Sequence, residues 1–251
     1  MKRTLGVLLV IVAVFACSRT VVKQPSSPYT QYQLATKLYE KGNYLKAQKE
    51  FQGVIYGFPG QTFIDTAQYY LGMTYFNIGS YSEGVGEFRK LLKTYPASAL
   101  ADDAQYQIAI SYYEESPSYS KDQTDTYSAI DEFGVFLDKY SDSPMVDDAR
   151  AKLNELYDKL AKKLYKAGEL YLKLNSYDPA ILYFEQVRDN YPQTQWAIIA
   201  MYNTGVAQMK LGKKAEALRT FQDFVTAFPN NKLVEKAQKH ITKLTPQQAG
   251  G

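Results

Sequence analysis

Cysteine and histidine, two side chains often used in nucleophilic catalysis and metal binding, are almost absent from this chain of 251 residues. It has one Cys, Cys17, and one His, His240. No disulfide can form within the chain, and the body of the chain has neither a Cys/His dyad nor a usual set of metal ligands. His240 stands alone between Lys239 and Ile241, and we expect it at the surface. The sequence therefore predicts no catalytic site, no metal site and no cofactor.

Paired acidic residues are the remaining candidates for chemistry. Each pair lies beside a predicted helix end, where capping and solvation are the simpler interpretation. No Gly-rich phosphate loop follows a strand. We therefore expect a protein that is not an enzyme. The pairs are Asp102/Asp103, Glu114/Glu115 and Asp147/Asp148.

Acylation is the chemistry that Cys17 does support. Residues 1–16 have a basic start and an apolar run from Leu5 to Ala16, which is too short to span a bilayer and is typical of a signal peptide. The segment Val14-Phe15-Ala16-Cys17 resembles the processing box of bacterial lipoproteins, although Phe15 departs from the small residue usual there. The resemblance implies that Cys17 becomes an acylated N-terminus, and several acyl chains anchor a protein stably. The alternative is an ordinary secreted protein with an unpaired Cys.

Residues 17–28 are polar, contain Pro25 and Pro28, and are typical of a flexible tether. Ser18 is compatible with sorting to the outer membrane in lipoproteins of this kind. The formal charge of the whole chain is +3, and loss of Lys2 and Arg3 with the leader brings it close to neutral. Bulk charge therefore gives no support for nucleic-acid binding.

Tyrosine is abundant, with 23 residues, and it offers binding rather than bond chemistry. A tyrosine has a large apolar area, a polar tip and few rotatable bonds, which suits peptide recognition. The alternative is that the rings pack between neighbouring helices. Five tyrosines stand at one position of a repeated pattern, and they are Tyr32, Tyr69, Tyr106, Tyr165 and Tyr202.

The elements that position these tyrosines are predicted helices of a repeat. Five times, a Phe is followed seven residues later by an aromatic residue that ends an apolar-periodic stretch, usually just before a Pro. Gly42, Gly79, Asn175 and Gly212 end the stretches that come before, as expected of left-handed residues after a helix. A Gly inside three of these stretches predicts close approach of a neighbouring helix. The pattern predicts an all-α solenoid of five helical hairpins. The Phe residues are Phe51, Phe88, Phe133, Phe184 and Phe221, and the inner glycines are Gly72, Gly168 and Gly205.

These hairpins resemble the tetratricopeptide repeat. Its spacing of Leu, Gly, Tyr, Ala, Phe and Pro is matched by Leu71, Gly72, Tyr75, Gly84, Phe88 and Pro96. Gln31 and Gln68 stand where that family has a Trp, and the period is 37 rather than about 34. Because the first helix of each unit lines a concave groove in that family, the resemblance implies a peptide-binding groove. Its candidate residues are Tyr32, Tyr39, Tyr69, Met73, Phe76, Tyr106 and Tyr113.

Two segments interrupt the repeat. Residues 115–126 are a polar insert in the third unit, which we interpret as an exposed loop, with contact to a partner as the alternative. Residues 144–174 keep helical spacing throughout and predict one long helix. Its lysines are interpreted as a solvated face, and they are Lys159, Lys162, Lys163 and Lys166.

The predicted division of the chain follows from these features. A leader (1–16) and a lipidated tether (17–28) precede the first three repeats (29–143). The long helix and the last two repeats occupy residues 144–244, and a disordered tail occupies residues 245–251.

The whole mature chain resembles the BamD family of outer-membrane β-barrel assembly lipoproteins. The resemblance implies a non-enzymatic scaffold, held by the lipid on Cys17 at the periplasmic face of the outer membrane. It implies that the C-terminal repeats bind periplasmic domains of the barrel-forming assembly subunit. It also implies that the N-terminal groove receives unfolded outer-membrane proteins.

A different function remains open from the same features. A periplasmic tetratricopeptide-repeat lipoprotein can coordinate cell division or cell-wall synthesis by binding a Tol-type protein. Proteins of that kind usually begin with a coiled-coil segment, whereas here only a short tether separates Cys17 from the first repeat.

Overall fold

The computed structural model describes residues 27–245, and within that range every regular element is an α-helix. The leader, Cys17, most of the predicted tether and the residues after Thr245 lie outside the described residues. In chain order the helices are α1 (Pro28–Glu40), α2 (Tyr44–Gly57), α3 (Ile64–Ile78), α4 (Tyr81–Thr94), α5 (Ala101–Glu115), α6 (Thr124–Lys139), α7 (Val146–Lys173), α8 (Tyr177–Asn190), α9 (Gln195–Lys210), α10 (Lys214–Ala227) and α11 (Val234–Leu244).

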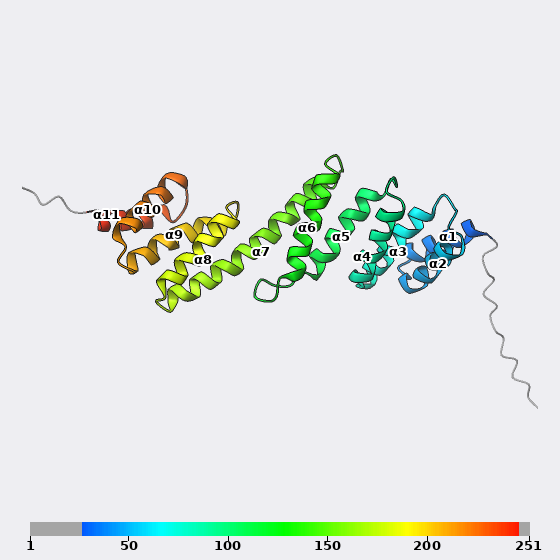
Figure 1. The fold of residues 1–251 in the computed structure, drawn as a ribbon, viewed down its shortest axis with the longest axis horizontal. Helices are drawn as coiled ribbons and strands as arrows, with labels where there is room; N and C mark the ends of the chain where they lie inside the picture. The colour runs from blue at the N-terminus through cyan, green and yellow to red at the C-terminus, as the bar shows by residue number, and fades with distance from the viewer. Residues whose placement is uncertain (1–26, 246–251) are drawn as a thin grey trace, which may run out of the picture.

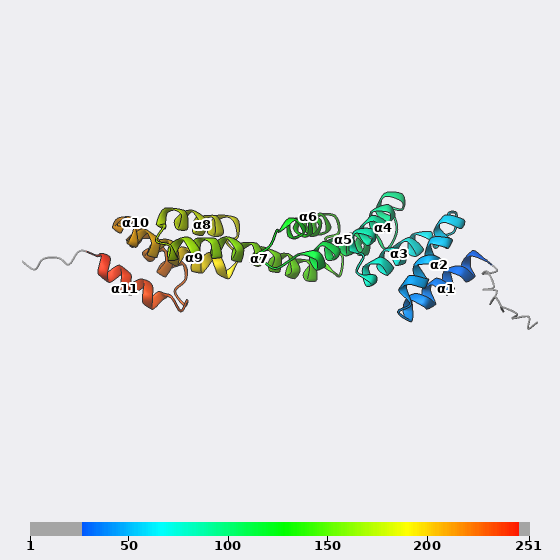
Figure 2. The same cartoon turned by 90° about the horizontal axis from the view of Figure 1, so that it is seen from below.

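The first ten helices form five consecutive hairpins, and the hairpins stack side by side into an elongated row (Figure 1). We call α1, α3, α5, α7 and α9 the first helices, and α2, α4, α6, α8 and α10 the second helices. The view turned by 90° shows the same row, with the N-terminal and C-terminal hairpins at opposite ends (Figure 2). The all-α architecture of five hairpins is confirmed.

The residues predicted to end the first helices adopt the left-handed conformation. Gly42, Gly79 and Gly212 have φ values of 73°, 83° and 86°, and Asn175 has a φ of 59°. L-residues other than Asn and Asp are strained at such angles, whereas achiral Gly is not, so these positions favour the residues they have. Each turn reverses the chain and lets the second helix pack back on the first.

The buried core of each hairpin is built around the Phe of the repeat, and all five of these Phe side chains are fully buried. An ideal Cβ on Gly72 would lie 2.6 Å from the Phe88 ring, and one on Gly168 would lie 2.7 Å from the Phe184 ring. The predicted close approach is therefore confirmed, and the neighbour is the Phe of the same hairpin. Apolar side chains on one face of each helix can be buried only by this stacking.

Helix α7 has 28 residues, about twice the length of most others, and contributes to two hydrophobic clusters. In its first half, Ala149 and Leu156 pack with Phe133 of α6. In its second half, Ala161 and Tyr165 pack with Phe184 of α8. Figure 1 shows α7 crossing from one half of the row to the other. This helix therefore joins the N-terminal and C-terminal hairpins.

An eleventh helix, which the repeat pattern did not predict, follows the fifth hairpin. Ala237 of α11 is fully buried in one cluster with Phe221 and Phe224 of α10. Because no sixth hairpin follows within the described residues, α11 covers apolar surface that would otherwise face water. None of the helices from residue 27 to 245 combines the length and the apolar run needed to cross a bilayer.

Candidate functional site

The seven predicted groove residues all lie on first helices of the N-terminal half. Tyr32 and Tyr39 are on α1, Tyr69, Met73 and Phe76 are on α3, and Tyr106 and Tyr113 are on α5. Each of these side chains is partly buried. Helical periodicity brings them to the side of each first helix that meets the next hairpin.

The aromatic rings of this stripe pack between helices. Tyr32 lies 4.8 Å from Phe63, which precedes α3, and 6.3 Å from Phe51, measured between ring centroids. Tyr106 lies 5.4 Å from Phe136 in the same way. These distances are typical of tilted and edge-to-face aromatic pairs. The rings therefore stabilise contacts within and between hairpins, as the packing interpretation expects.

The hydroxyl groups of several tyrosines reach the next first helix. Asn77 Nδ2 donates a hydrogen bond to Tyr39 Oη at 3.1 Å, across 38 residues of sequence. Tyr106 Oη donates to the Asp148 carboxylate of α7, and burial and this acceptor raise the pKa of the Tyr106 phenol. Hydrogen bonds between successive first helices therefore accompany the ring packing.

Tyr113 also contacts the next first helix through its hydroxyl group. Its hydroxyl donates to the Glu155 carboxylate of α7, and this hydrogen bond, together with burial, raises the pKa of Tyr113 to about 12. Lys152 Nζ lies 4.7 Å from the centre of the Tyr113 ring. A phenol with so high a pKa stays protonated at neutral pH and acts only as a hydrogen-bond donor or acceptor.

His240 occupies the corresponding place in α11, so its expected surface position is wrong. Its ring stacks on Phe221, with centroids 4.8 Å apart and planes at 17°. Its Nε2 lies 3.2 Å from Tyr202 Oη, and its Nδ1 is buried without a hydrogen-bond partner among the described residues. Burial, with Lys243 nearby, holds the pKa of His240 below its usual value. The cause is that α11 continues the register of the first helices, which the sequence pattern had not extended past Pro229.

Sequence analysis missed these hydrogen-bond partners on the following first helix, although a signal was present. A polar residue stands 38 positions after a stripe tyrosine in the pairs Tyr39/Asn77, Tyr165/Asn203 and Tyr202/His240. Where the polar insert lengthens the connection between α5 and α6, the separation is 42 in the pairs Tyr106/Asp148 and Tyr113/Glu155. The offset of 38 would have identified the first three pairs.

Within the polar insert, residues 116–123 form the loop between α5 and α6, and half of them are exposed as expected. The loop is nevertheless anchored to α7 by lysines, so the interpretation of these lysines as a solvated face is wrong. Lys159 Nζ donates to Ser116 Oγ at 2.7 Å, and Lys163 Nζ donates to the Lys121 carbonyl at 2.6 Å. Lys162 Nζ lies 4.7 Å from the centre of the Tyr119 ring. Burial lowers the pKa of Lys159. Lysines on α7 satisfy carbonyl groups that a loop without regular structure leaves unpaired.

Gln123 stabilises the insert by hydrogen bonds to its backbone. This side chain is only 4% exposed, and its Nε2 shares its two hydrogens among the carbonyl oxygens of Ser118, Lys121 and Asp122, at 2.9–3.1 Å. The insert is therefore an ordered element beside the middle of α7, where the two halves of the row meet.

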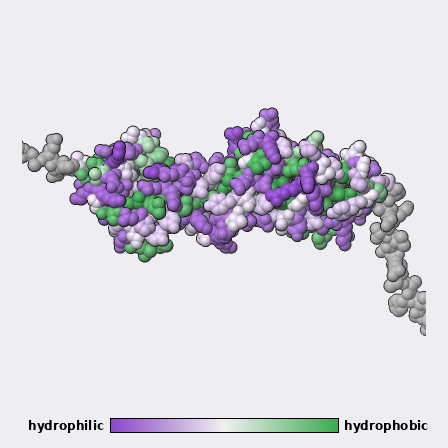
Figure 3. All heavy atoms as spheres, viewed as in Figure 1, coloured by the Kyte–Doolittle hydropathy of each residue, from purple (hydrophilic) through white to green (hydrophobic). Residues whose placement is uncertain are grey.

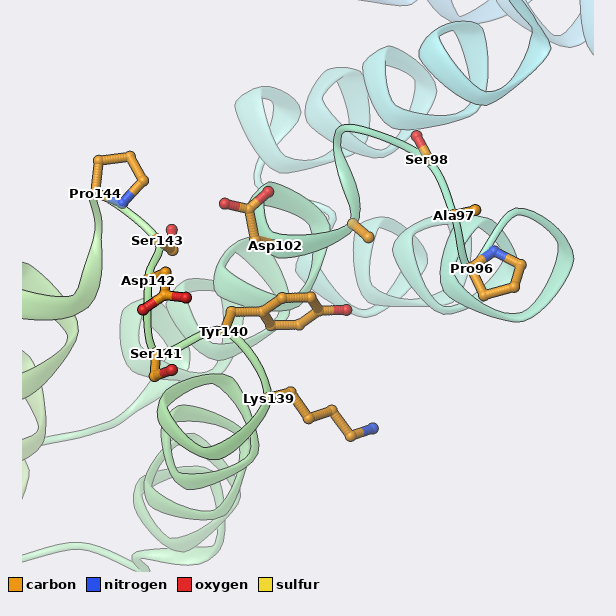
Figure 4. Close-up of a pocket in the computed structure, with 11 residues that line it drawn as sticks. Pro96, Ala97, Ser98, Asp102, Lys139, Tyr140, Ser141, Asp142, Ser143 and Pro144 are labelled. Atoms are coloured by element: carbon orange, nitrogen blue, oxygen red, sulfur yellow. The ribbon is translucent and has the colours of Figure 1, made fainter.

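An open pocket lies between the turns that follow α4 and α6 (Figure 4). Its volume is about 480 Å³, and the Tyr140 ring extends across it between Asp102 and Lys139. Burial and the Asp102 carboxylate raise the pKa of Tyr140. The three side chains offer hydrogen bonds and charge but no nucleophile with an adjacent base.

Hydrophobic residues on the viewed face form small patches between hydrophilic ones (Figure 3). Within residues 27–245, no group of three or more His, Cys, Asp or Glu side chains is arranged to hold a metal ion. The arrangement offers aromatic edges, hydroxyls and charges for hydrogen bonding and packing. These features define an α-helical repeat protein of tetratricopeptide-like architecture.

Comparison with known families narrows this class. The model of the YfiO family, described as outer membrane lipoprotein, matches residues 24–217. The chain therefore belongs to the YfiO family of outer membrane lipoproteins, and the resemblance to BamD is confirmed. This chain is 30% identical over 212 residues to "Outer membrane protein assembly factor BamD" of Rickettsia prowazekii (strain Madrid E), and the match covers 84% of each chain.

Two solved structures of repeat proteins are also similar to it. A TPR repeats protein from Bacteroides fragilis has a TM-score of 0.49 at 14% identity, over 87% of this chain and 99% of that one. The TPR2AB domain of yeast Sti1, in complex with pHSP90, has a TM-score of 0.42 at 16% identity, over 88% and 86%.

Proposed function

We propose that this protein is a non-enzymatic scaffold in the assembly of outer-membrane β-barrel proteins. The observation that carries the proposal is the relationship to an outer membrane protein assembly factor along 84% of both chains. A row of hairpins without a catalytic constellation among its described residues is suited to holding partners in place. In this proposal the mechanism is binding and positioning of polypeptides.

The proposed anchor is the lipid on Cys17, which would hold the chain at the periplasmic face of the outer membrane. Cys17→Ala removes the acylation site, and we expect the variant in the soluble periplasmic fraction, without incorporation of a palmitate analogue. Incorporation of label into the variant, or a wild-type chain that carries none, would contradict the anchor.

The proposed partner of the C-terminal repeats is the periplasmic part of the barrel-forming assembly subunit. Helix α11 completes that end of the row and presents exposed polar side chains around its buried face. The proposed ligands of the N-terminal first helices are unfolded outer-membrane proteins, which carry extended aromatic segments. An extended peptide can contact tyrosine edges and hydroxyls while the rings stay packed.

Affinity purification of the tagged full-length protein from detergent-solubilised membranes tests this function. We expect a large β-barrel subunit to co-purify, as identified by mass spectrometry, and not to appear with an unrelated tagged lipoprotein. Recovery of Tol-type or cell-wall synthesis proteins in its place would support the coordinator function and contradict the assembly function.

A further inference from the structure

Acidic and basic side chains are distributed unevenly along the row of hairpins, although the net charge of the whole chain is only +3. Residues 27–143 carry 15 acidic and 9 basic side chains, whereas residues 144–245 carry 11 acidic and 16 basic side chains. The N-terminal half is therefore net acidic and the C-terminal half net basic. Segregation on this scale creates opposite potentials at the two ends of an elongated molecule.

The segregation is found at one structurally equivalent position of the first helices. Each first helix has a small buried residue at one repeated position, and these residues are Ala35, Gly72, Ala109, Gly168 and Gly205. The residue five positions later lies in the last turn of each first helix and is exposed in all five hairpins. We call these five residues the end row. In chain order they are Glu40, Asn77, Glu114, Lys173 and Lys210.

The two glutamates of the end row do not stabilise their own helices. A carboxylate in the last turn is disfavoured by the helix dipole by about 0.3–1 kcal/mol, whereas a lysine there is favoured. Glu40 ends α1 and Glu114 lies one residue from the end of α5. Neither forms an ion pair within residues 27–245. Their positions are therefore explained better by a ligand than by the fold.

Two further equivalent positions distinguish α7 from α5 in the same way. Asp103 of α5 corresponds to Lys162 of α7, and Gln107 corresponds to Lys166. Lys166 pairs with Glu169 at 3.0 Å, and Lys173 approaches the same carboxylate at 3.3 Å, so two lysines share one acid. The end of α7 keeps an excess of positive charge toward solvent.

We propose that the first-helix side of the row binds an extended polypeptide in one charge register, with its basic stretch over α1–α5 and its acidic stretch over α7 and α9. This inference rests on the proposed function, in which the first helices bind unfolded polypeptides. Charge complementarity sets orientation and excludes wrong registers more than it adds affinity. The ligand class is thus narrowed to segments whose basic and acidic residues are segregated.

Two synthetic peptides of identical composition test the register on the full-length protein in detergent. In one peptide the lysines and glutamates form two separate blocks, and in the other they alternate, with the same aromatic residues in both. We expect the block peptide to bind at least ten-fold more tightly, and this advantage to fade at high salt because exposed charges are screened. A photoreactive group in its lysine block should crosslink to residues 27–143, and one in its glutamate block to residues 144–245.

Charge-reversal variants locate the effect. Lys166→Glu with Lys173→Glu should remove the preference for the block peptide, as should Glu40→Lys with Glu114→Lys. The matched control, Arg188→Glu with Arg219→Glu, makes the same charge change on exposed residues of second helices in the C-terminal half, and it should retain the preference. Because three glutamates on successive turns of α7, at positions 166, 169 and 173, can unfold it, Lys166→Gln with Lys173→Gln serves as a milder variant with a smaller loss in the same direction.

Three results would overturn the register. Equal affinity for the two peptides, with crosslinks along the first helices, would reject the register and leave the polypeptide-binding function in place. Absence of binding by either peptide would reject both. Salt-sensitive self-association in sedimentation, abolished by the charge reversals, would show that the complementary charges pair two antiparallel copies of this chain.

Discussion

Tyr165 of α7 accepts a hydrogen bond from Asn203 of α9 at 2.8 Å, and this contact joins the first helices of adjacent hairpins. The same relationship, at the same offset of 38 residues, links Tyr39 to Asn77 and Tyr202 to His240. A tyrosine ring that packs inside one hairpin thus presents its hydroxyl to the next. The contact makes the orientation of one hairpin depend on its neighbour, as stacked repeats require.

Tyr165→Phe removes this hydroxyl and keeps the ring. We expect the free energy of unfolding to fall by about 1 kcal/mol, because the partly buried Asn203 amide loses its partner. Urea unfolding followed by circular dichroism measures the change. The matched control is Tyr183→Phe, whose hydroxyl has no hydrogen-bond partner in the described part of the chain, and it should change stability by less than about 0.5 kcal/mol. Equal effects of the two substitutions would show that the hydroxyl contact contributes nothing.

Gly168→Ala tests the close approach of first and second helices. An added Cβ would lie 2.7 Å from the Phe184 ring, so we expect a loss of about 1–3 kcal/mol despite the higher helix propensity of Ala. Gly134→Ala, in α6, adds a Cβ with nothing within 4 Å and should gain about 0.5–1 kcal/mol. A thermal midpoint that rises for both variants would contradict the packing described for Phe184.

His240 makes the docking of α11 sensitive to pH. Its pKa in the folded state is lowered from 6.5, chiefly by burial, so the unfolded chain binds the proton more readily. Stability is therefore complete above pH 6.5 and falls as the pH drops below that value. Hydrogen exchange of α11 amides at pH 7.5 and pH 5.5, corrected for intrinsic rates, should show weaker protection at the lower pH.

His240→Gln removes the titration and serves as the control for that experiment. Its α11 protection should be nearly equal at the two pH values, whatever its absolute level. A pH dependence that persists in the variant would assign it to other groups, such as acidic residues outside α11.

Gln123→Leu tests the role of the insert at the junction of the two halves. The Asp122 carbonyl would lose its donor and the buried Thr126 hydroxyl would lose the Gln123 acceptor, whereas the Lys121 and Ser118 carbonyls keep Lys163 Nζ and the Lys121 N–H. A buried unsatisfied group costs about 1–3 kcal/mol. We expect faster hydrogen exchange in residues 116–123 and a broader distribution of distances between spin labels on α4 and α10. The control is Gln222→Leu, on the exposed side of α10, which should leave both unchanged. An unaltered distance distribution in Gln123→Leu would show that α7 alone sets the relation of the halves.

Local signals were sufficient to predict the helices and turns of the five hairpins, but not α11. The positive φ of Gly79 favours a glycine, Pro96 cannot continue a helix, and the Phe88 ring leaves no room for a side chain at Gly72. Contacts between hairpins were less visible, because they depend on how far one helix shifts along another. The insert between α5 and α6 makes the offset of Tyr106 to its partner 42 rather than 38, and the role of Lys159 depends on where the insert folds back.

The groove remained a prediction for a related reason. Tyr69 and Tyr106 lie on first helices, where the register placed them, but their rings pack on Phe88 and Phe136 of the same hairpins. Residue type alone does not separate a ring that fills space from one that also contacts a peptide. Exposed neighbours such as Asn77 are better probes, because substitution there removes the hydrogen bond to Tyr39 and leaves the buried rings in place.

Site-specific photo-crosslinking in cells tests polypeptide binding by the first helices most directly. A photoreactive amino acid at Asn77, exposed on α3, is compared with one at Lys93, exposed on the second helix α4 of the same hairpin. We predict that unfolded outer-membrane proteins crosslink at position 77 and not at position 93. Equal crosslinking at the two positions, or crosslinking only at 93, would contradict binding by the first-helix side of the row.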